Sequence, residues 1–469
     1  MPQPMRGCVS KSTNTFKIWN KTPQPYLAVN REIFRIAIPN IISNITVPLM
    51  GLVSTAVVGR WSGDAAVIGA LALGASIFNF IYWNCSFIRM GTSGLTAQAY
   101  GAGDFYETTA MLIRAVVISA IMGVACVVFQ KPLGDLSLWL MNGDGLVAEY
   151  FYARIWAMPA GILLFGIYGW FIGMQNATIP MAISIMVNSL HILVGYWFVF
   201  GYDMGIVGIA YASVVSQWVG LVLAAVLIFF FFRHTFRPVK IADALKLSAM
   251  RRFFQVNGDI IVRTFCNVGV YTFFTAASAR MGDAAVLAVN SVLMQLLMLF
   301  SYMSDGFAYA AEAMTGRFVG AQDLPSLKRC LRYCVVWTFA TAAIAVSGYL
   351  VGWDELFVAF MESGSEADIA EVLEVARRYV GWIIVIPIFA AMPFMLDGVM
   401  AGATLTRVMR NSMFWATVAF FAIYYAMLPI MGNDALWLAF LLYIILRLVL
   451  QYFMSHRLDD IYKQIKIEN

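Results

Sequence analysis

A five-residue segment occurs twice in this chain. Gly-Asp-Ala-Ala-Val occupies residues 63–67 and, unchanged, residues 282–286. The same shift in numbering carries residues 101–104 (Gly-Ala-Gly-Asp) onto residues 320–323 (Gly-Ala-Gln-Asp), which differ at one position of four. Two matches in one register predict a duplicated unit of about 220 residues, which is long enough for about six membrane-crossing helices.

The composition of the chain requires an apolar solvent. Hydrophobic residues make up 61% of the 469 residues and charged residues 12%, which leaves too little polar surface to coat a soluble protein of this size. We therefore expect the lipid bilayer to surround it. The net charge of +5 arises from basic residues that gather in a few loops, where they indicate orientation, so no nucleic acid partner is expected.

Twelve apolar runs have the length of helices that cross about 30 Å of hydrocarbon. They are residues 32–59, 65–94, 106–129, 148–174, 180–200, 205–232, 254–280, 284–318, 326–350, 372–402, 408–430 and 434–455. The chain is therefore predicted to be an all-α membrane protein, with twelve transmembrane helices in two pseudo-symmetric six-helix lobes.

Loop charge predicts how the lobes are oriented. The basic segment 233–253 and the segment 354–371, which has six acidic residues and no basic one, should lie inside and outside the cell, respectively. The predicted order is a cytoplasmic N-terminal tail (1–31), an N-lobe (32–232), a cytoplasmic basic linker (233–253), a C-lobe (254–455) and a cytoplasmic C-terminal tail (456–469).

The eighth predicted span carries an acidic stripe. Its members Tyr302, Asp305, Tyr309 and Glu312 are spaced by 3, 4 and 3 residues, so they share one face of the helix. Carboxylates are costly to bury in lipid, so this face should line a water-filled cavity or a partner. Such carboxylates are functional-site candidates; the alternative is a structural carboxylate with satisfied hydrogen bonds.

Other predicted spans hold ionisable residues too. Asp397 precedes two glycines of the tenth span, at a spacing that permits close helix approach. Asp259 and Arg263 are four residues apart on the seventh span and are predicted to form a structural ion pair. His191 is the only histidine in a predicted span. With an unperturbed pKa of about 6.5 it could exchange protons; the alternative is a hydrogen-bonded packing residue.

Motifs for enzymatic chemistry are absent from the sequence. It contains no Walker A segment, no nucleophile elbow and no set of metal-ligand residues at a suitable spacing. The cysteines indicate neither disulfides nor a metal site. We therefore expect no enzyme, no cofactor and no bound metal.

Residues 305–313 (Asp-Gly-Phe-Ala-Tyr-Ala-Ala-Glu-Ala) resemble the signature of the DNA-damage-inducible F branch of the multidrug and toxic compound extrusion (MATE) transporters. The resemblance extends to residues 38–44, which include Asn40 and Asn44, and to residues 51–59. It implies a MATE/MOP-type fold with a central cleft, lined in part by these asparagines, in a bacterial inner (plasma) membrane. It also implies export of organic, often cationic compounds in exchange for H⁺ or Na⁺.

Three positions depart from the family pattern. Members usually carry an aspartate, regarded as the cation-coupling carboxylate of the N-lobe, where this chain has Ser54. They commonly place asparagine and aspartate where this chain has His191 and Gly195. Because a hydroxyl does not carry a proton through a cycle, we expect coupling to rest on the C-lobe carboxylates. Asp305 is the preferred carrier and His191 the alternative.

The leading hypothesis is a monomeric secondary antiporter that exports an amphipathic, cationic compound in exchange for H⁺, with Na⁺ as the second choice. Its partners would be a small organic substrate, a coupling cation and the bilayer. A flippase for a lipid-linked precursor is the nearest rival, although Arg89 and Arg263 make a sparse basic cleft for a pyrophosphate. If the absence of a carboxylate at Ser54 means that coupling is lost, the chain would instead be an uncoupled uniporter or a receptor that transports nothing.

Overall fold

The computed structural model describes residues 26–143, 145–360 and 366–454, so most of both predicted tails lies outside the described residues. In chain order the helices are α1 (Tyr26–Ser62), α2 (Ala65–Cys85), α3 (Phe87–Gly101), α4 (Phe105–Val128), α5 (Gln130–Met141), α6 (Gly145–Arg154), η1 (Ile155–Ala157), α7 (Met158–Gly173), α8 (Thr178–Tyr196), η2 (Trp197–Gly201), α9 (Gly205–Phe232), α10 (Ile241–Ala244), α11 (Leu247–Arg280), α12 (Ala284–Gly320), α13 (Leu324–Phe360), α14 (Glu366–Gly402), α15 (Thr406–Met431) and α16 (Asn433–Met454). Across these ranges every regular element is helical, and twelve spans are long and apolar enough to cross a membrane, as predicted.

Two of the spans are interrupted helices. α2 and α3 form one span that is broken at Ser86, and α6, η1 and α7 form another. In the second, Pro159 stands in the first turn of α7, directly after the 3₁₀ turn, because proline lacks the backbone N–H that a continuous helix needs. The segment predicted as an acidic loop is largely helical, since α13 continues to Phe360 and α14 begins at Glu366.

The repeated sequence forms the same turn in both halves. Gly63 and Gly282 adopt left-handed backbone angles, with φ of +60° and +73°, which favour glycine. The aspartate that follows each glycine caps the next helix through its side chain. Asp64 caps α2 and Asp283 caps α12, and each accepts a backbone N–H two residues on, at 2.8 and 2.9 Å. The repeat is therefore a helix-start signal that both copies kept.

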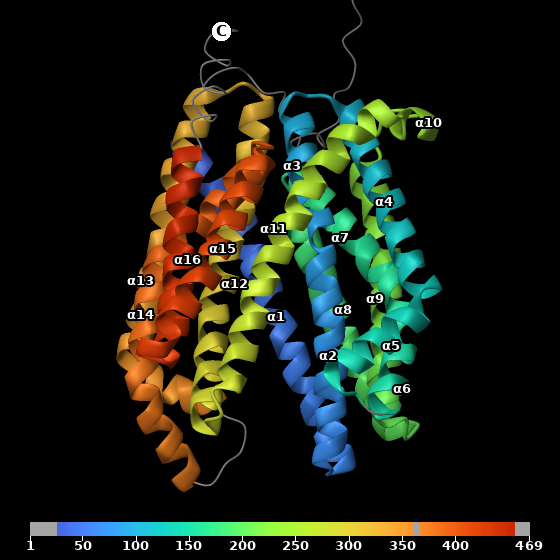
Figure 1. Ribbon diagram of the computed structural model, residues 1–469. Coiled ribbons are helices and arrows are strands. Elements are labelled where there is room, and N and C mark those ends of the chain that lie inside the picture. The colour runs from blue at the N-terminus through green and yellow to red at the C-terminus, as the bar shows by residue number, and fades with distance from the viewer. Residues whose placement is uncertain (1–25, 144, 361–365, 455–469) are drawn as a thin grey trace, which may run out of the picture.

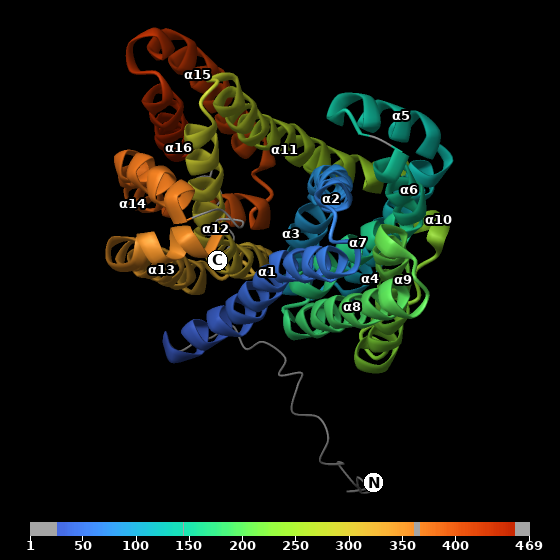
Figure 2. The ribbon, with the colours of Figure 1, turned by 90° about the horizontal axis from the view of Figure 1, so that it is seen from below.

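The helices gather in two groups, and α1 and α11 cross between them (Figures 1 and 2). α1 packs on α12 and α11 packs on α3, so the first helix of each half leans against the second span of the other. The C-terminal group has a core of its own around Phe274, Phe300 and Trp437. The core of the N-terminal group, around Phe78 and Phe151, continues into α11, α14 and α15.

The two groups meet where α3 and α12 end. We call this the α10 end, because the short helix α10 lies there, at the top of Figure 1. A Cβ atom on Gly101 would meet the carbonyl oxygen of Arg317, and one on Gly320 would meet the carbonyl oxygen of Gln98. The repeat carries Gly101 onto Gly320 and Gln98 onto Arg317, so each copy makes the same contact with the other. A two-fold relation between the copies requires such reciprocal contacts. Glycine is needed here because any side chain would push the two backbones apart.

Candidate functional site

Asp397 is the centre of a charge cluster in the C-terminal group. The residue is 2% exposed, and its carboxylate pairs with the guanidinium groups of Arg263 and Arg447. Gln451 donates to its second oxygen at 2.6 Å. These partners come from α11 and α16, so the Asp397 side chain on α14 ties three helices together and has both oxygens engaged.

The predicted ion pair between Asp259 and Arg263 is wrong. Asp259 instead binds two residues of α15, Arg410 at 2.7 Å and Thr406 at 2.8 Å. Arg263, one turn further along α11, reaches α14 and binds Asp397. The short aspartate side chain reaches only the helix packed beside it, and that helix supplies both of its partners.

The predicted stripe on α12 runs from half-buried to fully buried positions. Tyr302, Asp305 and Tyr309 are half-buried, whereas Glu312 is fully buried. Asp305 lies within electrostatic range of Arg263 and Asp397. Among the described residues no side chain or backbone group forms a hydrogen bond to its carboxylate, and because Asp305 is half-buried rather than enclosed like Glu312, its carboxylate can change partners.

Arg89 brings a positive charge from the N-terminal group to this stripe. Its guanidinium carbon lies 3.9 Å from the centre of the Tyr309 ring, and its Nη1 lies 3.8 Å from Oε2 of Glu312. The region thus combines guanidinium groups and carboxylates in equal number, which balance when all are ionised. They are Arg89, Arg263 and Arg447, and Asp305, Glu312 and Asp397. In the described parts of the chain, no three His, Cys, Asp or Glu residues are grouped to hold a metal ion.

The N-terminal group has a histidine where the C-terminal group has carboxylates. His191 of α8 is 3% exposed, and its Nε2 lies 3.0 Å from Ser54 Oγ of α1. Its Nδ1 lies 3.3 Å from Ser213 Oγ of α9. Each hydroxyl also lies near a carbonyl oxygen of its own helix. A serine hydroxyl that donates to the carbonyl can accept a hydrogen bond from a protonated ring nitrogen. A hydroxyl that rotates toward the ring can instead donate to an unprotonated ring nitrogen. The site therefore fits either protonation state of His191.

The two predicted asparagines of α1 have different partners. Asn40 is 5% exposed and donates to the Ile36 carbonyl of its own helix at 2.8 Å. Asn44 donates to the Tyr302 carbonyl at 3.3 Å and so joins α1 to the stripe on α12. A hydrogen bond therefore connects Asn44, but not Asn40, to the acidic stripe.

Three residues of these sites were missed by sequence reasoning, namely Ser213, Arg447 and Gln451. Arg447 lies inside the twelfth apolar run, so the rule that intramembrane charges mark functional positions could have found it. Ser213 and Gln451 give no comparable signal, because uncharged polar residues occur in many membrane helices without a special role.

A cavity of about 330 Å³ opens between the two groups beside the stripe. Trp83 of α2 lines one side and Tyr271 of α11 lies opposite, with ring centroids 6.5 Å apart. Met294, Gln295 and Met298 of α12 complete this wall. Tyr271 also lies within electrostatic range of Asp305. The cavity therefore combines aromatic, thioether and amide groups with a nearby carboxylate.

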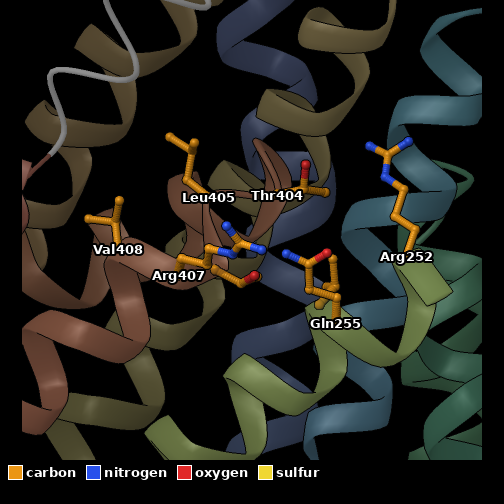
Figure 3. A pocket seen from close by; sticks show the side chains of 8 residues that line it. Arg252, Gln255, Thr404, Leu405, Arg407 and Val408 are labelled. Atoms are coloured by element: carbon orange, nitrogen blue, oxygen red, sulfur yellow. The ribbon is translucent and has the colours of Figure 1, made fainter.

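A second cavity, of about 260 Å³, lies at the α10 end, where Arg252 and Arg407 line it (Figure 3). Arg252 donates to the side-chain oxygen of Gln98 at 2.8 Å, and Gln98 donates to the Gly402 carbonyl at 2.8 Å. The predicted site residues are not among those that line this cavity. It belongs to the junction that holds the two groups together.

Comparison with known proteins identifies similar chains. The model of the MatE family matches residues 39–197 and 260–426. DNA damage-inducible protein F of Escherichia coli is 32% identical over 426 residues, which are 89% of this chain and 90% of that protein. A probable multidrug resistance protein NorM of Synechocystis sp. is 23% identical over 332 residues, 68% of this chain and 71% of that protein. The solved structure of MATE in the bent conformation superposes with a TM-score of 0.82 at 17% identity. That comparison covers 95% of this chain and 100% of the chain in the solved structure.

Proposed function

This chain belongs to the MatE family of membrane transporters, and we propose that it is a secondary active antiporter that exports amphipathic, cationic organic compounds in exchange for H⁺. Its homologues include multidrug transporters, and the family consists of transporters rather than enzymes. One observation carries the proposal. Asp305 is a half-buried carboxylate of α12, it has no hydrogen-bond partner among the described residues, and it lies within electrostatic range of Arg89, Arg263 and Asp397.

Protonation of Asp305 would give the balanced charges around the stripe a net positive charge. Asp397 stays ionised because two guanidinium groups bind it. Loss of the negative charge on Asp305 therefore leaves the arginines in excess, and in a medium of low dielectric constant they repel a bound cation. By linkage, a bound cation weakens proton binding to the same degree, which is the thermodynamic requirement for exchange of one for the other.

The cavity beside the stripe supports the substrate class. Trp83 and Tyr271 offer aromatic faces that attract organic cations. Methionine side chains such as Met294 and Met298 adapt to ligands of different shape. An amphipathic cation held there would feel the field of Asp305, since Tyr271 belongs to the cavity and lies within electrostatic range of that carboxylate.

We propose further that the α10 end faces the cytoplasm of a bacterial inner membrane. Arg251, Arg252 and Lys328 lie at this end, and lysine and arginine favour the cytoplasmic side. In a variant without the native cysteines, Ala242→Cys should react with an impermeant maleimide only after cells are permeabilised. Asn142→Cys, at the opposite end, should react in intact cells. The reverse pattern would invert the orientation.

The function is tested with purified protein in proteoliposomes that contain a fluorescent organic cation. An imposed pH gradient should drive the cation against its own concentration gradient, and a sodium gradient at equal pH should not. Accumulation driven by sodium alone would assign the coupling to Na⁺. Downhill flux that neither gradient alters would make the protein a uniporter and overturn the proposal.

A flippase for an anionic lipid-linked precursor is the second candidate. The arginines at the cleft favour it, but Arg263 and Arg447 are already bound to Asp397, which leaves Arg89 to hold a phosphate. The same proteoliposomes distinguish the two functions. Translocation of a fluorescent polyprenyl phosphate, together with no gradient-driven movement of the cation, would favour the flippase.

A further inference from the structure

Glu312 lies deep between α3 and α12 without a hydrogen bond. The residue is 0% exposed, and neither carboxylate oxygen has a hydrogen-bond partner among the described residues. Arg89 Nη1 of α3, at 3.8 Å, faces Glu312 from beyond hydrogen-bond distance. Ser93 of α3 also faces the carboxylate, and its buried hydroxyl likewise lacks a partner within the described chain. Glu312 thus differs from Asp397, whose oxygens are both bound.

The packing around Glu312 depends on closure of the α10 end. α14 touches the backbone of α12 at this level, since a Cβ atom on Gly402 would meet the Glu312 carbonyl oxygen. α3 and α12 meet again at Gly101 and Gly320, about two turns nearer the end. Any movement that opens the α10 end separates α3 from α12, and it would expose the Glu312 carboxylate to water from that side.

The two protonation states of Glu312 therefore favour different conformations. The donors nearest an ionised Glu312 are the Ser93 hydroxyl and the Arg89 guanidinium, and neither reaches hydrogen-bond geometry. The buried carboxylate therefore loses its hydration and gains little in return, whereas water solvates it once the end opens. The charged groups that face Glu312 are Arg89 and Arg263, and Tyr309 lies one turn away on the same helix. Arg89 offsets part of the loss but donates no hydrogen bond to the carboxylate. A neutral carboxyl group suits the closed junction better, because it can donate to a neighbouring hydroxyl.

We propose that Glu312 is the residue whose protonation allows the α10 end to close and whose ionisation favours its opening. This inference rests on the proposed antiport, in which the two ends open in turn. Glu312 takes its proton from the α10 side before closure and returns it to the same side on opening, so it moves no net proton across the membrane. Asp305 exchanges protons with the cleft, and the two acids of one stripe thus have separate roles.

The test measures the junction directly, without substrate or gradient. Spin labels at Ala102→Cys and Ala321→Cys, equivalent exposed positions beyond α3 and α12, report the separation of the two helices in nanodiscs by electron paramagnetic resonance. Between about pH 5 and pH 9, the short-distance population of the otherwise native protein should fall as the pH rises. In Glu312→Gln, which imitates the neutral acid, the short distance should persist throughout this range.

Two matched variants separate this role from a general effect of substitution. Glu312→Asp keeps a carboxyl group and should restore the pH response. Glu107 lies near the same end, and its carboxylate pairs with Arg114 inside the N-terminal group. Glu107→Gln should therefore show the same pH response as the spin-labelled protein that is otherwise native, called the parent. A Glu312→Gln variant that opens with pH as the parent does, or a parent that shows no pH response, overturns the inference. Sodium-driven transport together with loss of the pH response in Glu312→Gln would instead overturn the exchange for H⁺ and leave the role of Glu312 in place.

Discussion

The two halves of this protein share a scaffold and differ in their buried chemistry. Both halves use a glycine–aspartate start signal for their second span and meet in reciprocal contacts at the α10 end. The N-terminal half buries His191 between two serines. The C-terminal half buries carboxylates against arginines, with Asp397 at the centre. Within the described chain, no buried Asp or Glu precedes Asp259.

This difference shows that the duplicated packing and the proton chemistry are separable. Caps and glycine contacts fix where helices begin and how closely they approach, and few residue types satisfy them. The buried polar groups are constrained only by the need for partners, which different side chains can satisfy. We therefore propose that the C-terminal half exchanges the proton and that the histidine of the N-terminal half has a packing role.

The largest expected effect is that of Asp305→Asn. The variant should fold, bind the cation more weakly than the otherwise native protein at every pH and lose gradient-driven export, because asparagine keeps the shape of the acid but carries no charge and takes up no proton. Flux in proteoliposomes at a fixed pH gradient measures this. Glu374→Gln, an exposed carboxylate of the same half, is the control and should transport like the parent. Export by Asp305→Asn at the same rate as the parent would show that Asp305 is not the proton carrier.

Asp397→Asn should reduce stability rather than remove coupling. The substitution leaves the buried Arg447 and the half-buried Arg263 without their counter-charge, and breaking a buried pair costs about 3–5 kcal/mol. Unfolding in detergent, followed by circular dichroism, measures the loss. Asp259→Asn is the comparison and should lose less, since its partner Arg410 is 38% exposed and regains water. Equal losses would mean that the Asp397 cluster is not the charge centre of its half.

Valine at Gly101 or at Gly320 should loosen the α10 end. Each side chain would press on a carbonyl oxygen of the opposite helix, and overpacking of this kind costs about 1–3 kcal/mol. The distance between spin labels at Ala102→Cys and Ala321→Cys should lengthen by a similar amount in both variants. Gly51→Val, where a side chain meets open space, should leave it unchanged. If the label distance lengthened in only one of the two valine variants, the two reciprocal contacts would not contribute equally to closing the α10 end.

The smallest expected effect is that of His191→Asn. Asparagine can hydrogen-bond to one or both serines but does not titrate, so export should fall by less than about three-fold, with the same dependence on the pH gradient. His191→Phe removes those hydrogen bonds and should destabilise the protein more. Abolished coupling in His191→Asn would transfer the carrier role to the N-terminal half.

Hydropathy and periodicity predicted the features that depend on one helix at a time. The twelve spans follow from run lengths, and the stripe from Tyr302 to Glu312 follows from spacing on a single helix. Partners across helices were not predictable, because the sequence does not say which helix lies beside which. Asp259 was assigned to Arg263 for this reason, although α15 supplies its partners. The contact of Arg89 with Tyr309 joins the two halves and was missed for the same reason.

The most direct test of the central claim is to count the protons released when the cation binds. Isothermal titration calorimetry in buffers of different ionisation enthalpy gives this number for the purified protein in detergent. The parent and His191→Asn should each release up to one proton per bound cation, because the cation displaces the proton of Asp305. Asp305→Asn imitates the protonated acid, so it should bind the cation more weakly and release no proton. Proton release that persists in Asp305→Asn and vanishes in His191→Asn would contradict the account and place the exchange site in the N-terminal half.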